Sequence, residues 1–176
     1  MQHLQAHSVR TGTFTLKSGK TSTWFIDSKQ TICRPDGLLL VADALLAALP
    51  ADITAVGGLT MGADPVAFGV AGVAAARGRP LRAFSVRKET KDHGAGGRIA
   101  GALEPGDRVA IVEDTVTRGI SPLDAAAVVA DAGAVPVLVV AVVDRGGTCA
   151  ARCADAGLGF IALVTAPQLG FAYEGG

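Results

Sequence analysis

From Pro35 onward, short apolar runs alternate with stretches of helical pattern, and this alternation limits the fold more than any other feature of the chain. The apolar runs, which we expect to be strands, lie at residues 53–56, 81–86, 109–112, 135–143 and 160–164. Helices are expected at residues 35–49, 64–77, 121–132 and 148–156. Continuous runs of Val, Ile and Ala are typical of parallel strands buried on both faces. The alternation therefore predicts an α/β fold in which helices flank a parallel sheet.

The first 34 residues follow a different pattern, which is polar and β-like. Strands are expected at residues 13–16 and 22–27, joined by a Lys-Ser-Gly-Lys turn. A chain of 176 residues suits one domain with a small appendage. We therefore expect residues 1–34 to form a small N-terminal hood and residues 35–176 to form the core.

Composition excludes several classes of partner and location. The formal net charge is zero, which argues against a nucleic-acid surface. The longest apolar run, residues 134–143, is about half as long as a membrane span, so no membrane association is expected. Residues 1–15 have no apolar segment of the kind found in signal peptides. Three cysteines, an odd and sparse count, favour a reducing compartment, and we expect a cytoplasmic protein.

Two of the cysteines, Cys149 and Cys153, lie four positions apart on one face of an expected helix. They could form half of a metal site. No His or further Cys is near in the sequence, so two small buried apolar side chains are the favoured interpretation.

Residues 111–121 carry the most chemical information. An apolar strand ends in two adjacent carboxylates, Glu113 and Asp114, and a loop with hydroxyl groups and a glycine leads to a helix that begins near Ser121. Backbone amides and a helix N-terminus favour a phosphate, and carboxylates accept hydrogen bonds from ribose hydroxyls. This arrangement predicts a site for a phosphorylated sugar. The alternative is an ordinary strand–loop–helix turn. A Walker loop is excluded, and no dinucleotide fingerprint follows an expected strand.

Polar or glycine pairs follow four of the expected strands. They are Gly57-Gly58, Arg87-Lys88, Glu113-Asp114 and Asp144-Arg145. Because ligands in open parallel sheets bind at the carboxyl ends of the strands, we expect these pairs to meet at one binding edge.

Residues 87–97 combine cations, a histidine and glycines. Glycines at 94, 96 and 97 make a regular element unexpected there. A charged run of this kind is often only a solvated loop. Here it follows a strand that ends at the expected phosphate edge, which favours a mobile lid that closes over an anionic substrate.

Taken together, these segments resemble the orotate phosphoribosyltransferase family along nearly the whole chain. Residues 87–97 resemble its catalytic loop, and residues 113–121 resemble its motif for binding the phosphoribosyl group. Residues 14–19 are similar to its orotate-binding segment, residues 56–65 to its loop near the pyrophosphate, and residues 143–145 to the strand end that helps to recognise the base.

The resemblance implies a type I phosphoribosyltransferase fold and a transfer of ribose 5-phosphate from 5-phosphoribosyl 1-diphosphate (PRPP) to orotate. It implies Mg²⁺ bound mainly through the diphosphate, with no protein metal ligand required. It also implies a homodimer with shared active sites, because the catalytic loop of this family reaches into the neighbouring subunit. An oxocarbenium-like transition state is expected, so catalysis rests on positioning, on stabilisation of the leaving group and on exclusion of water.

The resemblance also assigns residues to roles. The expected catalytic residues are Lys91, His93 and Asp114, with Lys91 as the main cation on the leaving group. The expected PRPP-binding residues are Arg87, Lys88, Lys91, His93, Glu113, Asp114, Thr115, Thr117, Arg118, Gly119, Ile120 and Ser121. The expected orotate-binding residues are Lys17, Phe25, Thr117 and Arg145.

The chain departs from the family pattern at three positions. Arg118 and Ile120 stand in the phosphate loop where Thr and Gly are usual, and Met61 stands near a lysine that some members place on the diphosphate. Backbone donors survive these changes, although a β-branched Ile120 restricts the loop geometry. Two other functions remain open at this point. One is transfer to a different heterocyclic base, and the other is a PRPP-binding regulator without catalysis.

Overall fold

A six-stranded sheet forms the centre of the protein in the computed structural model, which describes the chain except residues 16–18, 20, 92–96 and 175–176. The strand order is β5-β4-β3-β6-β7-β8. These strands are β3 (Ala55–Leu59), β4 (Arg82–Lys91), β5 (Gly97–Gly101), β6 (Arg108–Val116), β7 (Val135–Asp144) and β8 (Gly159–Thr165). All neighbouring strands are parallel except β5, which runs antiparallel to β4. The predicted parallel sheet is therefore confirmed.

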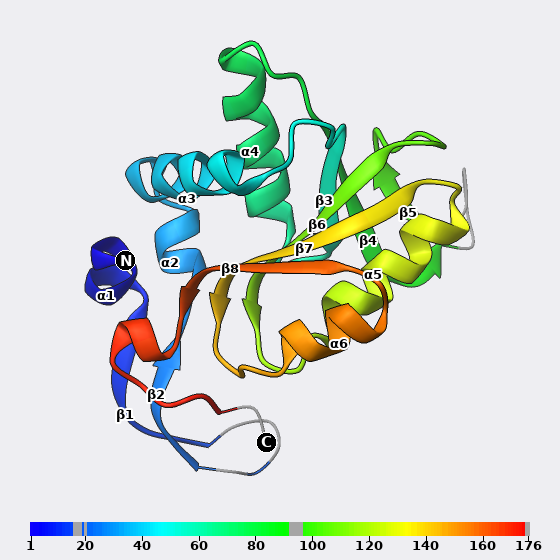
Figure 1. Ribbon diagram of the computed structural model, residues 1–176. Coiled ribbons are helices and arrows are strands. Elements are labelled where there is room, and N and C mark those ends of the chain that lie inside the picture. Colours follow the sequence, from blue (N-terminus) through cyan, green and yellow to red (C-terminus); the bar gives the residue numbers. More distant parts are fainter. Residues whose placement is uncertain (16–18, 20, 92–96, 175–176) are drawn as a thin grey trace.

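Helices cover both faces of this sheet, as Figure 1 shows. Helices α3 (Pro35–Ala48) and α4 (Asp64–Ala76) lie on one face, and α5 (Ile120–Asp131) and α6 (Cys149–Asp155) lie on the other. Burial on both faces explains why residues 109–112 of strand β6 are apolar without interruption. Ala110 and Val112 belong to the core under α3 and α4, whereas Val109 and Ile111 belong to the core under α5 and α6. Buried strands need apolar residues on both faces.

The expected helices and strands agree with the structure to within a few residues, with one clear error. Residues 87–91 were expected to be irregular, but they continue strand β4, and Gly97 begins the unexpected strand β5. The two strands pair at Val86 with Ile99 and at Lys91 with Gly97, with an irregularity between these pairs. Polar side chains do not prevent a strand at the edge of a sheet, where one side of the ladder faces solvent. The segment is thus the stem of a β-hairpin.

The N-terminal segment forms its own small unit of structure. It contains α1 (Gln2–His7), an antiparallel pair of strands, β1 (Val9–Thr15) and β2 (Thr21–Ile26), and the short α2 (Lys29–Ile32). The expected hairpin is present, and α1 was not expected. Trp24 is 2% exposed and Ile32 is fully buried, and both belong to the same apolar cluster as α3. Burial against this cluster holds the segment on the core.

The C-terminal end returns to the N-terminal segment. After β8 and the short 3₁₀ helix Pro167–Leu169, Phe171 stacks on Trp24 with ring centroids 4.5 Å apart. Figure 1 shows this tail (red) beside the N-terminal hairpin (blue) at one end of the main sheet. Among the helices that the structure describes, none has the length and apolar character to cross a membrane.

Candidate active site

The acidic pair Glu113–Asp114 is buried in the last part of strand β6. Their residues are only 6% and 8% exposed. Strand β6 lies between β3 and β7, and it continues to Val116, so the pair lies within the strand rather than after it. The pairing with β3 ends at Ile111, so the backbone that carries the carboxylates is held by β7, where Glu113 pairs with Ala141 and Thr115 with Val143. Two adjacent buried carboxylates are costly unless they are paired or protonated, and the structure shows both solutions.

Asp114 is paired with groups from the N-terminal segment. Lys29 on α2 forms an ion pair with its Oδ2 atom, and Ser28 donates a hydrogen bond to the same oxygen at 2.9 Å. Ser28 in turn accepts a hydrogen bond from the Thr115 hydroxyl at 3.2 Å. Burial acts to raise the pKa of Asp114, but Lys29 and Ser28 outweigh it and hold the pKa below its ordinary value. Asp114 is therefore ionised.

Glu113 behaves in the opposite way. Burial and the neighbouring charge of Asp114 raise the pKa of Glu113 to about 8. Its Oε1 atom accepts a hydrogen bond from the Asp114 backbone amide at 3.2 Å. At neutral pH the ligand-free pair therefore carries about one negative charge and one proton. A proton on Glu113 can be donated to a bound hydroxyl oxygen, and Asp114 can accept from another.

Glycines let the loop after β3 approach this pair. A Cβ atom on Gly62 would lie 2.4 Å from Glu113 Oε1 and 2.6 Å from Asp114 Oδ1. A Cβ atom on Gly58 would lie 2.2 Å from the Val112 carbonyl oxygen. The expected Gly57-Gly58 signal is thus explained by close packing of strand β3 between its neighbours. In the same loop, Met61 is 70% exposed and follows a cis peptide bond.

The loop at residues 117–121 leads directly into α5, as its sequence predicts. Gly119 has φ of 73° and precedes the first residue of the helix, Ile120. A Cβ atom on Gly119 would lie 2.7 Å from the Cys149 sulfur. Because Gly119 takes the left-handed conformation, Ile120 does not need it, and Ile120 is 53% exposed. The helix has no side-chain cap, and its first turn has no acidic residue, so its amides are suited to an anion.

The cationic segment lies on the β4–β5 hairpin. Arg87 is half-buried, and Lys88 is exposed. The backbone of Lys91 ends β4, its side chain lies outside the described part of the structure, and so does all of His93. Arg98 holds the hairpin on α5 through two bonds to the Asp124 carboxylate, one of them 2.9 Å long, and it also donates to the Arg87 carbonyl oxygen at 2.7 Å. The stem is therefore tied to the helix whose N-terminus is the expected phosphate site.

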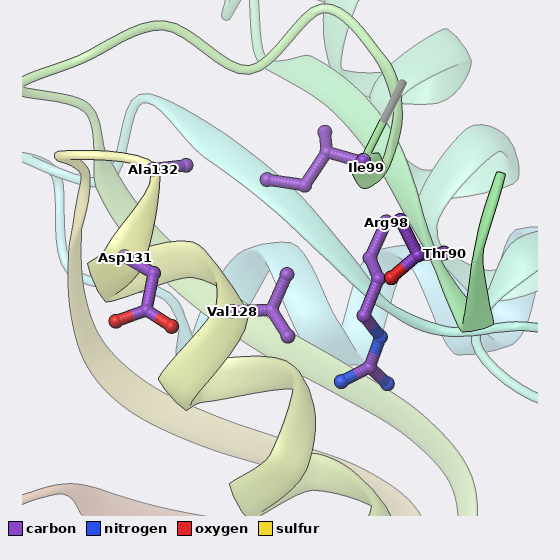
Figure 2. Close-up of a pocket in the computed structure, with 7 residues that line it drawn as sticks. Thr90, Arg98, Ile99, Val128, Asp131 and Ala132 are labelled. Atoms are coloured by element: carbon purple, nitrogen blue, oxygen red, sulfur yellow. The ribbon is translucent and has the colours of Figure 1, made fainter. Parts of the chain in front are cut away.

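A groove of about 490 Å³ separates this hairpin from the outer side of α5. Figure 2 shows Thr90, Arg98 and Ile99 from the hairpin across from α5 residues such as Val128 and Asp131. The groove contains neither of the two buried carboxylates. The groove therefore lies between the hairpin stem and α5, outside the acidic site.

The expected base-binding residues lie near the N-terminal hairpin. Arg145 is placed over the Trp24 ring at 5.1 Å and forms an ion pair with Glu174 of the C-terminal tail. Phe25 is 38% exposed and contacts Phe14, with ring centroids 5.7 Å apart. The backbone of Thr117 approaches Gly146, the residue after Arg145. Lys17 lies outside the described residues.

The structure therefore brings most of the expected residues to one edge and adds several that sequence reasoning missed. Lys29, Ser28, Trp24 and Glu174 all contact expected site residues. No local pattern marks Lys29 or Glu174, because each meets its partner across a long separation in the chain. Cys149 and Cys153 are buried in the core, as predicted, with their sulfurs 3.8 Å apart. The described residues contain no cluster of three or more metal-binding side chains.

Comparisons with known proteins agree with this geometry, although no family model matches the chain. An orotate phosphoribosyltransferase of Streptomyces avermitilis is 44% identical over 160 residues, which cover 90% of this chain and 87% of that protein. The orotate phosphoribosyltransferase of Mycobacterium tuberculosis, in complex with Fe(III) dicitrate, matches with a TM-score of 0.84 and 37% identity, covering 97% of this chain and 96% of that one.

A further crystal structure of the Mycobacterium tuberculosis enzyme, in complex with PRPP, has a TM-score of 0.80 and 34% identity, and it covers 97% of this chain and 96% of that one. The order of the motifs, the mixed sheet with its buried acidic pair, and these relatives point the same way. The chain belongs to the orotate phosphoribosyltransferase family and has the type I phosphoribosyltransferase fold.

Proposed function

We propose that this protein transfers ribose 5-phosphate from PRPP to orotate, giving orotidine 5'-phosphate and pyrophosphate in de novo pyrimidine biosynthesis. The observation that carries the proposal is the buried Glu113–Asp114 pair directly before the uncapped N-terminus of α5. A sugar phosphate needs hydroxyl partners and an anion site at this spacing, and both are present on consecutive elements. The family relatives at 44% and 37% identity support the same reaction.

Within this proposal, residues 113–121 bind the phosphoribosyl half of PRPP. Glu113 and Asp114 hold the ribose hydroxyls, and the charge on Asp114 favours the cation that develops at the sugar. Thr115, Thr117, Arg118, Gly119, Ile120 and Ser121 surround the 5'-phosphate, mainly through backbone amides. Arg118 and Ile120 are both exposed, so neither side chain is packed into the core. The departures from the family pattern leave the backbone donors available.

The hairpin supplies the cations for the leaving group. Arg87, Lys88, Lys91 and His93 neutralise the diphosphate, with Lys91 as the principal cation. The stem is tied to α5 through Arg98 and Asp124, and the groove between stem and helix is lined by neither carboxylate of the acidic pair. This geometry supports a homodimer in which each hairpin completes the site of the partner subunit.

Orotate binds beside the N-terminal hairpin. Lys17 pairs with its carboxylate, Arg145 and Thr117 meet the ring edge, and Phe25 packs on the ring. Phe25 is suited to this because more than a third of its surface is open while Phe14 supports it. The division into an N-terminal segment, residues 1–34, and a core, residues 35–176, is part of the proposal because the two meet at the base.

Mg²⁺ is proposed to enter with PRPP. The donors near the site are two carboxylates, one of them protonated and the other paired with Lys29, which suits an ion held mostly by diphosphate, ribose and water rather than by a protein cage. When bound, the ion would neutralise charge on the diphosphate. We also propose a cytoplasmic location, in keeping with three free cysteines and with relatives that are metabolic enzymes.

Loss of orotate absorbance in the presence of PRPP and Mg²⁺ tests the reaction directly. We expect turnover with orotate and none with uracil, because only orotate offers a carboxylate to Lys17. Turnover with another base but not with orotate would show that the acceptor is that base. PRPP binding in calorimetry without turnover of any base would instead identify a PRPP-binding regulator.

Mixed dimers test the shared sites. A verified heterodimer of Lys91→Ala and Asp114→Asn subunits has one site that carries neither change if the hairpin acts on the partner. We expect activity well above that of either homodimer. Heterodimers as inactive as both homodimers would show that each chain uses its own hairpin.

A further inference from the structure

Lys29 is the described cation that contacts the buried acidic pair. It lies on α2, in the N-terminal segment, and its Nζ atom reaches Oδ2 of Asp114. The Lys29 side chain is 40% exposed, whereas that of Asp114 is 11% exposed. The ammonium therefore sits at the mouth of the acidic site, between buried charge and open solvent. The aliphatic part of a lysine can span such a boundary while the charged end meets its partner.

Donors from three residues hold the Asp114 carboxylate in one orientation. Lys29 and Ser28 occupy Oδ2, and the backbone amide of Thr115 donates to Oδ1 at 2.8 Å. The side chain of Glu113 also hydrogen-bonds to this carboxylate. The same Oδ1 faces the loop at Gly62, where a Cβ atom would lie 2.6 Å away. The Asp114 carboxylate thus lies beside the loop that the family resemblance places near the pyrophosphate.

We propose that Lys29 is a positioning residue for PRPP, which fixes the Asp114 carboxylate and offsets its charge where the polyanionic substrate binds. This inference rests on the proposed PRPP site at Glu113 and Asp114. Lys29 acts through Asp114, so it is not a catalytic residue. A charge-assisted bond from the N-terminal segment orients a group on the central strand, and the segment thereby becomes part of the PRPP site as well as the orotate site.

Two physical effects of removing Lys29 have the same sign. Asp114 would lose its only described ionic partner and could rotate or take up a proton. Where Asp114 instead stays ionised, its uncompensated negative charge lies near the phosphates of the substrate and opposes PRPP binding. Orotate binding depends on other residues, so its Michaelis constant should change little. If the Lys29 contact were purely structural, its removal would instead lower the melting temperature and raise the Michaelis constants of both substrates alike.

The test compares Lys29→Met, Lys29→Arg and the control Arg34→Met. Arg34 is an exposed cation of the same segment, and its Nε atom donates only to the Gln30 carbonyl oxygen among the described groups. The measurements are the dissociation constant of PRPP with Mg²⁺ by calorimetry, the Michaelis constants of both substrates, and the melting temperature. If Lys29→Met does not fold, Lys29→Gln takes its place because the amide keeps one hydrogen bond to Asp114.

We expect Lys29→Met to weaken PRPP binding roughly 10- to 100-fold, as loss of one buried charge partner does. The Michaelis constant of orotate should stay within about twofold, and Lys29→Arg should restore most of the PRPP affinity. Arg34→Met should match the wild type. Unchanged PRPP affinity in folded Lys29→Met, or equal losses for both substrates, would overturn the inference. If the wild type binds PRPP but turns over no orotate, the proposed function fails while the calorimetry still decides the role of Lys29.

Discussion

The acidic half and the cationic half of the proposed site are built on opposite kinds of backbone. Glu113 and Asp114 lie on β6, which pairs with strands on both sides, and their residues are almost fully buried. The cations lie on the β4–β5 hairpin, where β5 is the edge strand and residues 88–90 are exposed. In the proposed site, the groups that hold the sugar are thus placed on an interior strand of the sheet, where they are buried. Groups that must approach after the substrate enters are placed where few contacts resist movement.

Removal of Lys91 should have the largest effect on the cationic half. We expect Lys91→Ala to lower turnover about 100- to 1,000-fold, since one preorganised cation on a leaving group contributes roughly 3–4 kcal/mol to the transition state. The melting temperature should not change, because the end of β4 pairs with β5, which lies at the edge of the sheet. Steady-state kinetics and a thermal scan measure both quantities. A loss below threefold would remove Lys91 from the catalytic role.

A methyl group at Gly58, next to the strand that carries the acidic pair, should lower the unfolding free energy of the protein. Its Cβ atom would lie 2.2 Å from the Val112 carbonyl oxygen, so strands β3 and β6 must move apart. We expect Gly58→Ala to cost at least about 2 kcal/mol of unfolding free energy, within the range of buried overpacking. The matched control is Gly72→Ala on α4, where nothing lies within 4 Å of the added Cβ atom.

Gly72→Ala should raise stability by about 0.5–1 kcal/mol because alanine favours a helix. Denaturant titration of the two variants compares them directly. Equal effects at the two positions would show that the centre of the sheet is less tightly constrained than its geometry indicates.

Loss of the hairpin anchor should have an intermediate effect. Arg98→Met removes both bonds to Asp124 and the bond to the Arg87 carbonyl oxygen. We expect turnover to fall roughly tenfold, because positioning of the cations, not their chemistry, is impaired. PRPP affinity measured without orotate should change less than turnover. If Arg98→Met keeps full turnover, the hairpin does not need its contact with α5.

A gradual effect, spread over several pH units, is a pH dependence of stability that comes from Glu113. Its pKa rises on folding from 4.5 to about 8, so the folded protein binds an extra proton between these values. The unfolding free energy of the ligand-free protein should therefore fall as pH rises from about 5 to 8, by at most about 1.4 kcal/mol per pH unit. Glu113→Gln should flatten this slope in urea titrations across that range. A slope that survives the substitution would mean that another group binds the proton.

Much of the fold could be predicted because local signals agreed with tertiary burial. The run from Val109 to Val112 faces two cores, so an uninterrupted apolar strand was the only pattern that would serve. The hairpin stem was missed because its edge position allows polar residues that resemble a loop. The short helix α1 was missed because it has few apolar residues, with Leu4 its one buried side chain.

In the candidate site, too, the residues that could be predicted are close in the chain, and those that could not be predicted are far apart. Residues 113–121 are contiguous, so one motif predicted both the acidic pair and the helix start. Lys29 and Glu174 contact Asp114 and Arg145 across 85 and 29 positions of the chain. A contact at such separation leaves no periodic or local mark in one sequence, and family patterns had drawn attention only to the residues that meet the substrate.

By itself, the sequence determined the α/β class, the order of the strands along the chain, the loop that leads into α5 and the family. Those properties depend on short-range patterns of apolar residues, glycine and charge. Only the tertiary structure decided the different states of Glu113 and Asp114. Their pKa values depend on burial in the sheet and on an ammonium group brought from α2, and neither is encoded next to them in the chain.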